Sequence, residues 1–461
     1  MWDFQVSRSS GATAIICYFR RITNMSILFY HIFLWFYRIG IGLAAWWNPK
    51  ARRWLQGRAG IFDKIRLEMQ EKDPGCPVVW MHCSSLGEFE QGRPVLESIS
   101  AQYPRCKIVL TFFSPSGYEV RKGYAGADHI FYLPLDSKSN ARRFISLVNP
   151  SLVLWVKYDY WYYYLTELKK RNIPVLLLSG VFRPDQPFFR WYGRLHRYML
   201  ECFTHLFVQT PVSKKLLGSL GLSRNVSIAG DTRFDRVVEI AGSTEPYPFI
   251  ETFCGEHPVI VAGSTWPEDE EEIDHYANTH PDIRFIIAPH EIDRDHLQEV
   301  KRLFKRSILY SEWSAQSTSA QQNASRTTAQ GSRQTGGSFN TLIIDNIGML
   351  AHLYRVATLC YVGGGFGDDG VHNVLEAAVY GKPVIFGPVI EKYIEAVELV
   401  DCGGGIVIDS ALEAESVFTR LLSDRNEYDL AGKAARDYVY TKKGATEKIA
   451  GYIQENRLLT S

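Results

Sequence analysis

Short apolar runs alternate with amphipathic stretches along most of this chain, and this alternation restricts its fold more than any other feature. The runs of the first half lie at residues 77–82, 107–113, 151–156, 173–180 and 205–210. They are rich in aliphatic and aromatic residues and have the length of strands that are buried on both faces. The stretches between them, such as GEFEQGRPVLESISAQYP, have the pattern of amphipathic helices. We therefore predict a βαβ series, which forms a doubly wound parallel sheet.

The same alternation returns in the second half of the chain. Its apolar runs lie at residues 258–264, 284–290, 341–346, 357–365, 382–388 and 404–409. Residues 239–258, between the two series, contain Gly and Pro and few periodic apolar positions, which is typical of a linker. A chain of 461 residues is also too long for one ordinary core. We expect two Rossmann-like domains, residues 51–240 and 241–461, with ligands at the carboxyl ends of the strands.

One polar segment interrupts the second series. Residues 311–340 are low in complexity and nearly free of apolar side chains. Such a segment cannot bury enough apolar surface to offset the entropy of ordering, so we predict a surface insertion here.

An aromatic-rich apolar segment, SILFYHIFLWFYRIGIGLAAWW, lies near the start of the chain at residues 26–47. As a helix it would be about as long as a bilayer is thick, although His31 and Arg38 are poorly tolerated at a bilayer centre. Basic residues follow it at Lys50, Arg52, Arg53, Arg58, Lys64 and Arg66. This order predicts a membrane anchor or interfacial helix over 25–50, with its basic flank on the cytoplasmic side. The alternative is a buried amphipathic helix that packs on the first domain. Residues 1–24 show no pattern and stay unassigned.

Charge and cysteine usage exclude several classes of protein. The net charge is +1, so no overall field attracts nucleic acid. The eight cysteines are scattered, without a Cys-x-x-Cys pair. That spacing fits reduced thiols in the cytosol and gives neither a disulfide framework nor a zinc site. No metal-binding cluster is visible in the sequence, and we expect no metal.

A glycine-rich segment in the second half has the pattern of a phosphate site. Gly363–Gly365 end a predicted strand, and we expect a helix to begin near Val371. Backbone amides at such a helix start favour a phosphate. His372, Asn373 and Glu376 would share one face of the first turns, where a carboxylate can accept ribose hydroxyls. The alternative is a purely structural turn between strand and helix. The segment lacks the lysine of an ATP-hydrolysing loop.

A second polar segment, HCSSLGEFEQGRPVLE at residues 82–97, follows the first predicted strand. It places Ser85, Gly87 and Glu88 in a loop at the carboxyl end of that strand. Glu90 lies farther into the following helix and would face elsewhere. An acidic residue in the first turn is also simply a favourable charge at a helix start.

These two segments, in this order, resemble the Kdo (3-deoxy-D-manno-octulosonic acid) transferase family, whose members have the glycosyltransferase-B fold of two Rossmann-like domains. The family's Ser-x-Gly-Glu motif matches Ser85–Glu88, and the resemblance implies that Glu88 is the general base. Its glycine loop and Asn-x-x-Glu pair imply donor contacts at Gly364, Gly365, His372, Asn373 and Glu376. TFFSPSGYE resembles a family segment that implies sugar or acceptor contacts at Ser114, Ser116 and Gly117, together with Ser85 and Gly87.

The chain departs from the family pattern at two donor elements. The family's Pro-Arg-His reads Pro289-His290-Glu291 here, and its Gly-Glu-Leu reads Gly348-Met349-Leu350. The resemblance still implies donor contacts from Pro289 and His290 and from the backbone of Ile347, Gly348 and Met349.

The resemblance implies metal-independent, inverting transfer of Kdo from CMP-Kdo to a lipid A precursor at the cytoplasmic face of the inner membrane. CMP-Kdo is then a co-substrate, and no cofactor is expected. Two alternatives stay open at this point. One is a transferase of the same fold that uses a UDP-sugar on another lipid or cell-wall acceptor, and the other is a non-catalytic scaffold docked on the membrane.

Overall fold

The computed structural model divides the chain into two compact units. It describes residues 9–70, 75–243, 247–324, 339–368 and 370–459. Unit 1 comprises residues 1–232 and 444–461, and unit 2 comprises residues 233–443.

Unit 1 contains a seven-stranded sheet in which every described pairing is parallel. The strand order is β3 (His129–Tyr132), β2 (Lys107–Phe112), β1 (Val78–Cys83), β4 (Leu152–Val156), β5 (Val175–Gly180), β6 (His205–Val208) and β7 (Val226–Ile228). The chain runs from β1 outward to β3 and then returns to add β4 beside β1. The switch point of this doubly wound sheet therefore lies between β1 and β4.

Alternate residues of these strands fill two cores, one on each face of the sheet. One face, with Trp80 and Trp155, packs against α3 (Ile61–Met69), α6 (Lys138–Val148) and α7 (Tyr162–Lys170). The other face packs against α4 (Leu86–Gln102) and α20 (Ala445–Glu455). Unit 1 also contains α2 (Pro49–Gln56), α5 (Pro115–Arg121), α8 (Arg194–Leu200) and α9 (Pro211–Ser219). This two-sided burial is what the continuous apolar runs predicted.

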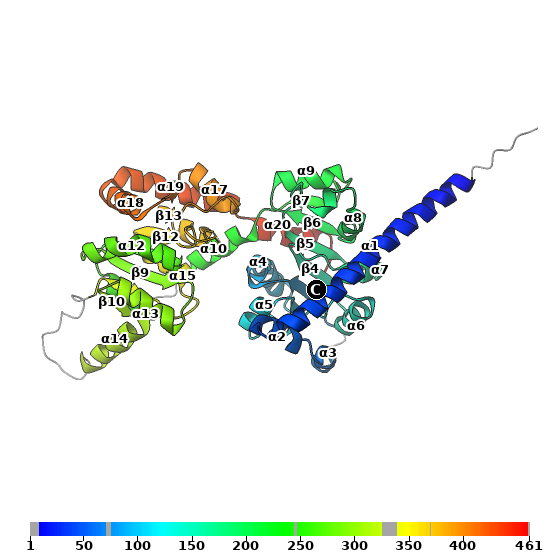
Figure 1. The fold of residues 1–461 in the computed structure, drawn as a ribbon, viewed down its shortest axis with the longest axis horizontal. Coiled ribbons are helices and arrows are strands. Elements are labelled where there is room, and N and C mark those ends of the chain that lie inside the picture. Colours follow the sequence, from blue (N-terminus) through cyan, green and yellow to red (C-terminus); the bar gives the residue numbers. More distant parts are fainter. Residues whose placement is uncertain (1–8, 71–74, 244–246, 325–338, 369, 460–461) are drawn as a thin grey trace, which may run out of the picture. The chain divides into compact units, whose positions relative to one another are not determined.

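The last helix, α20, belongs to unit 1 although it follows unit 2 in sequence (Figure 1). Ala445, Ile449 and Ile453 lie in the core that α4 also lines. The sequence pattern predicts one domain over residues 241–461, whereas residues 444–461 belong to unit 1. Hydrophobic periodicity shows that a helix has an apolar face, but it does not show which sheet that face covers.

Unit 2 contains a second seven-stranded sheet, and its described pairings are also parallel. Its order is β10 (Ser307–Leu309), β11 (Thr341–Ile343), β9 (Arg284–Pro289), β8 (Val259–Thr265), β12 (Leu359–Val362), β13 (Val384–Phe386) and β14 (Gly405–Val407). Here the switch point lies between β8 and β12. Helices α12 (Pro267–Thr279), α13 (Arg294–Leu303) and α18 (Ala411–Ser423) pack on one face. The other face carries α10 (Thr232–Gly242), α11 (Pro248–Cys254), α17 (Ile394–Asp401) and α19 (Arg425–Lys442).

Two segments differ from expectation in unit 2. The stretch 239–258, expected as a linker, contains the end of α10 and all of α11, and Ile250 and Phe253 lie in the core. The polar stretch expected as an insertion begins as α14 (Tyr310–Ala324). Trp313 of α14 is buried, and its indole nitrogen donates to the Phe249 carbonyl at 2.8 Å. One aromatic side chain thus attaches the start of a polar segment, and residues 325–338 lie outside the described residues.

The apolar segment near the start of the chain forms α1 (Ser9–Ala44). Within it, Met25–Ala44 is long and apolar enough to cross a membrane, and 6% of that span is buried. Leu34 is the side chain of this span that reaches the core, while Phe29, Phe33 and Phe36 are exposed. The alternative of a helix buried in the first domain therefore does not fit.

Candidate active site

The carboxyl ends of β1 and β4 bring two carboxylates into one region of unit 1. The loop after β1 carries Ser84 and Ser85 and leads into α4, and the loop after β4 carries Lys157 and Asp159. These two strands flank the switch point of the sheet, where ligands of doubly wound folds bind.

Glu88 is the third residue of α4 and its carboxylate turns back onto the loop. The backbone nitrogens of Ser84 and Ser85 donate to Oε2, the latter at 3.3 Å, and the Ser85 hydroxyl accepts from the Glu88 nitrogen. These contacts form a capping box, so Glu88 does help to begin the helix. Among the described residues, no donor bonds to its other oxygen, Oε1. That oxygen is the one available to a substrate hydroxyl.

Burial changes the protonation of Glu88. The residue is 8% exposed, and this burial, together with the negative charge of Asp159, raises the pKa of its carboxyl group to about 7. The hydrogen bonds from Ser84 and Ser85 and the charge of Lys157 act in the opposite direction. The burial effect is the larger. A carboxylate whose pKa lies near neutral pH has the basicity that a general base needs.

Asp159 is joined to the same loop by the Ser84 hydroxyl, which donates to its Oδ2. Burial also raises the pKa of Asp159, against the effect of this hydrogen bond. Lys157 has a φ of +53°, a left-handed conformation that a lysine rarely adopts. In the sequence, Asp159 lies within a row of aromatic residues, and only the topology shows that it belongs beside Glu88.

The structure places the other predicted residues of unit 1 around the same loop. Ser114 caps α5, its hydroxyl lies 2.9 Å from that of Ser116, and its backbone nitrogen donates to the Ser84 carbonyl at 2.8 Å. Gly117 is needed for packing, because a Cβ there would lie 2.2 Å from the Phe112 ring. Gly87 has open space where a Cβ would be. Glu90 instead forms an ion pair with Arg121 at 2.6 Å.

The glycine loop of unit 2 differs from the predicted phosphate cradle. The expected helix from Val371 forms only as α16 (Leu375–Ala378). The Gly364 nitrogen donates to buried Asp269 at 2.8 Å, and Asp269 also accepts from the Trp266 nitrogen and the Tyr361 hydroxyl. Gly364 is thus tied to the start of α12, whereas the sequence pattern alone indicated a free helix start.

Close backbone packing explains why glycine occupies position 365. A Cβ on Gly365 would lie 2.5 Å from the backbone nitrogen of Gly387. We expect Gly365→Ala to lower the stability of unit 2 by about 1–3 kcal/mol, the usual cost of overpacking, seen as a lower thermal midpoint. Gly367→Ala is the matched control, since the nearest atom to its Cβ would be 3.8 Å away. Equal thermal midpoints for the two variants would show that the backbone contact between Gly365 and Gly387 does not require glycine at position 365.

Three aromatic rings stack beside this loop. The Trp266 and His290 rings are 4.7 Å apart between centroids, and the His290 and His372 rings are 4.5 Å apart. The Trp266 indole nitrogen donates to His372 Nε2 at 2.9 Å. The stack brings together two predicted donor residues, His290 and His372, and adds Trp266, which the sequence analysis missed. Its position two residues after a predicted strand was the available signal.

Asn373 and Glu376 also lie together. The Asn373 amide donates to Glu376 Oε1 at 2.9 Å, and its own oxygen accepts from the Leu375 nitrogen at 3.3 Å. Pro289 is the last residue of β9, which pairs with β8, so it lies at the carboxyl end of the strands. Ile347 and Gly348 are exposed in the loop before α15 (Leu350–Leu353), while Met349 is buried.

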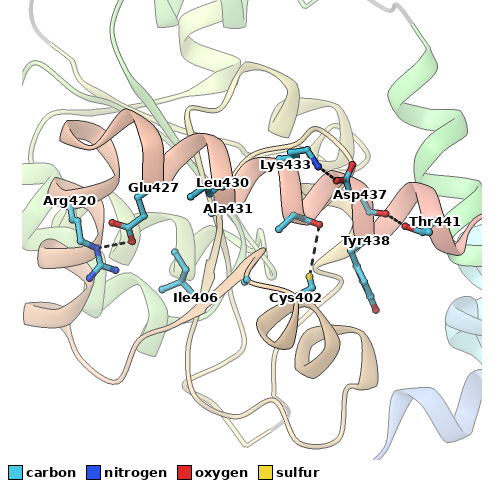
Figure 2. A pocket seen from close by; sticks show the side chains of 13 residues that line it. Cys402, Ile406, Arg420, Glu427, Leu430, Ala431, Lys433, Asp437, Tyr438 and Thr441 are labelled. Atoms are coloured by element: carbon cyan, nitrogen blue, oxygen red, sulfur yellow. Dashed lines mark hydrogen bonds and ion pairs between the residues drawn. The ribbon is translucent and has the colours of Figure 1, made fainter.

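A separate open depression of about 820 Å³ lies on unit 2 against α19 (Figure 2). Its charged side chains pair with one another, Arg420 with Glu427 at 3.0 Å and Lys433 with Asp437. Its lining includes none of the predicted donor residues, so we do not place the donor there. Within the described ranges, no group of three or more His, Cys, Asp or Glu side chains is placed to hold a metal ion.

Comparison with known proteins identifies the family. Residues 54–236, which include Glu88 and Asp159, match the model of the 3-deoxy-D-manno-octulosonic-acid transferase (kdotransferase) family. The chain is 26% identical over 416 residues to the 3-deoxy-D-manno-octulosonic acid transferase of Chlamydophila psittaci, covering 87% of this chain and 89% of that protein. It is also 26% identical over 388 residues to a bifunctional glycosyltransferase/methyltransferase of Fusobacterium nucleatum, covering 83% of this chain but 55% of that longer protein.

Solved structures support the fold class. UDP-GlcNAc 2-epimerase from Neisseria meningitidis has a TM-score of 0.57 at 17% identity, covering 82% of this chain and all of that chain. At this identity the likeness concerns the fold, and it confirms the predicted glycosyltransferase-B class of two α/β sheets. Family model, curated relatives and fold agree: residues 54–236 match the Kdo transferase family, and the chain is similar over most of its length to Kdo transferases.

Proposed function

We propose that this protein transfers Kdo from CMP-Kdo to a hydroxyl of a lipid A precursor, with Glu88 as the general base. The observation that carries the proposal is the Glu88 carboxyl group, whose pKa burial raises to about 7 at the switch point of unit 1. A sugar hydroxyl is a weak nucleophile, and a carboxylate of this basicity can take its proton as the new bond forms.

In the proposed reaction the acceptor oxygen attacks the anomeric carbon of Kdo directly. The bond from that carbon to the CMP phosphate breaks, CMP leaves with the electron pair, and the acceptor proton passes to Glu88. A single displacement inverts the anomeric carbon. Unit 2 would hold the donor through the stacked His290 and His372 and the Asn373–Glu376 pair. The family resemblance adds Gly364, Gly365 and the loop at 347–349. No protein-bound metal is needed if these groups offset the charge of one phosphate.

The binding of free nucleotides tests the donor class. We expect CMP to bind the full-length protein in calorimetric titration, and UMP and UDP to bind at least about tenfold more weakly, a difference of roughly 1.4 kcal/mol. Tighter binding of UDP would favour the transferase that uses a UDP-sugar. Failure of all three nucleotides to bind would favour the scaffold.

We further propose that α1 lies on the cytoplasmic surface of the inner membrane. The Tyr30 hydroxyl donates to Asp136 at 2.7 Å, and the Tyr163 hydroxyl lies 2.5 Å from His31 Nε2. Both contacts tie the first third of the apolar span to unit 1, where a helix that crosses the bilayer would meet lipid or headgroups. The exposed aromatic residues of its other face and the basic residues after it suit an interfacial helix on anionic lipid.

Negative charge introduced by substitution on the exposed face of α1 tests this placement. Phe33 and Phe36 are 55% and 61% exposed. We expect Phe33→Glu with Phe36→Glu to weaken binding to phosphatidylglycerol vesicles at least about tenfold, since each buried Phe contributes roughly 1.5–3 kcal/mol. The thermal midpoint should not change. Leu412→Glu with Leu430→Glu, at exposed positions of unit 2, is the matched control and should bind as the unaltered protein does. Equal vesicle binding by both double variants would refute the interfacial helix.

A further inference from the structure

His82 is a buried histidine beside the proposed base, and the proposed reaction leaves it without a role. It lies on β1 and is completely buried. Its Nδ1 is 2.9 Å from the Thr111 hydroxyl of β2. Its Nε2 has no hydrogen-bond partner and lies 4.0 Å from Oδ2 of Asp159. A buried polar atom without a partner is costly, and such an atom next to a proposed active site calls for a functional reason.

The hydrogen bonds around Thr111 indicate where the imidazole proton is. The Trp80 indole nitrogen, which can only donate, donates to the Thr111 oxygen at 2.8 Å. The single Thr111 hydrogen then goes either to His82 Nδ1 at 2.9 Å or to the Met81 carbonyl at 3.4 Å. In the second case Nδ1 would donate to Thr111, and a bare Nε2 would face the Asp159 carboxylate 4.0 Å away. Electrostatics therefore favour the first case, in which Nδ1 accepts. The imidazole proton is then on Nε2, directed at the Asp159 carboxylate.

The surroundings keep this imidazole neutral. Burial lowers the pKa of His82 to about 3, and the positive charge of Arg58 acts in the same direction. The Trp155 ring packs against the imidazole with centroids 4.7 Å apart and thereby fixes its plane. Asp159, by contrast, lies in a loop and keeps 25% of its side chain exposed, so its carboxylate has more room to turn. The histidine is therefore the rigid partner and the carboxylate the adjustable one.

We propose that His82 is a positioning residue that acts through Asp159: its Nε2–H holds the Asp159 carboxylate against the Ser84 hydroxyl, beside the loop that carries Glu88. A small turn of Asp159 closes the 4.0 Å gap to a hydrogen bond. The chain of contacts then runs from Trp80 through Thr111, His82, Asp159 and Ser84 to Glu88. This inference rests on the proposed function only in treating Glu88 as the base.

The expected effect on Glu88 has a definite sign. Two neighbouring charges shift the pKa of Glu88: Asp159 raises it and Lys157 lowers it. The Glu88 charge in turn raises the pKa values of Cys83 and Tyr160. Without His82, Asp159 turns toward solvent or takes up a proton more readily. Either change removes negative charge near Glu88. The pKa of Glu88 should then fall, and the low-pH limb of kcat/KM should move to lower pH.

A pair of amide variants tests this. In His82→Gln the side-chain nitrogen takes the place of Nε2, whereas in His82→Asn it takes the place of Nδ1. We expect His82→Asn to lower the pKa of Glu88 by about one unit and kcat by about tenfold to a hundredfold. His82→Gln should restore the Glu88 titration and keep kcat within about threefold of the unaltered enzyme. Glu88 is followed by ¹³C NMR of glutamate-labelled full-length protein, with its signal assigned by Glu88→Gln.

The tautomer of His82 in the unaltered protein provides a second test, which does not depend on a variant that folds. In ¹⁵N-histidine-labelled protein, the proposal requires His82 to carry its proton on Nε2. A proton on Nδ1 overturns it, as does identical Glu88 titration in the Asn and Gln variants. Both NMR readings require neither donor nor acceptor. If they come out as expected while no Kdo is transferred, the proposed function fails and the positioning role stands.

Discussion

Replacing Glu88 with Gln is expected to lower kcat by about 100- to 10,000-fold, the usual loss when a general base is removed. The affinity for CMP should stay nearly unchanged, because Glu88 belongs to unit 1 and the predicted donor residues belong to unit 2. Gln also keeps an oxygen that can accept from the Ser84 and Ser85 nitrogens, so the start of α4 is preserved. Turnover is measured as the rate of CMP release, and nucleotide affinity by calorimetry.

The pH profile separates loss of the base from loss of structure. Since burial raises the pKa of Glu88 to about 7, kcat/KM should increase tenfold per pH unit well below pH 7 and level off above it. The residual activity of Glu88→Gln should lack this limb. Glu90→Gln removes the same charge two residues away, where Glu90 is ion-paired with Arg121, and should keep both rate and profile. A Glu88→Gln enzyme of near-normal rate would exclude Glu88 as the base.

The second large effect is expected at Glu376. If this carboxylate accepts the ribose hydroxyls of CMP, Glu376→Ala removes a charge-assisted contact of about 1.5–3 kcal/mol. CMP should then bind roughly ten- to a hundredfold more weakly in calorimetric titration. Asn373, which donates to Glu376 at 2.9 Å, holds the carboxylate in place. Deoxy-CMP should bind the unaltered protein less tightly than CMP, and the variant should discriminate less between the two nucleotides.

Glu427→Ala is the matched control for this experiment. It removes a carboxylate of unit 2 that pairs with Arg420 in the depression on α19. CMP affinity should not change in this variant. If Glu376→Ala also binds CMP normally, or if Glu427→Ala loses affinity to the same degree, the ribose contact is not at Glu376.

The central strands could be predicted from the sequence, and three of the four edge strands could not. Every apolar run of the two series overlaps a strand of the structure. The three strands that were missed, β3, β7 and β10, lie at edges of the two sheets. Central strands are covered on both faces and paired on both sides, so their residues are almost all apolar. An edge strand of three or four residues leaves a pattern too short to separate from a loop.

For the candidate site, the sequence indicated residues that are consecutive in a motif but not those that join from elsewhere. Glu88, Ser85, Asn373 and Glu376 lie in short segments with a definite pattern. Asp159 and Trp266 reach the same two regions only because β4 lies beside β1 and α12 begins beside the glycine loop. The glycines also had a second explanation, because Gly365 is required by its contact with Gly387. Composition and spacing cannot separate a phosphate loop from a packing turn.

The measurement that tests the central claim most directly is mass spectrometry of lipid products made by the full-length protein. The protein, in phosphatidylglycerol vesicles, is incubated with lipid A precursor and either CMP-Kdo or UDP-GlcNAc. We predict that CMP-Kdo alone increases the mass of the lipid by one or more Kdo residues, with CMP released in equal number and with inverted anomeric configuration by NMR. A lipid modified by UDP-GlcNAc, or by neither donor, would contradict this account.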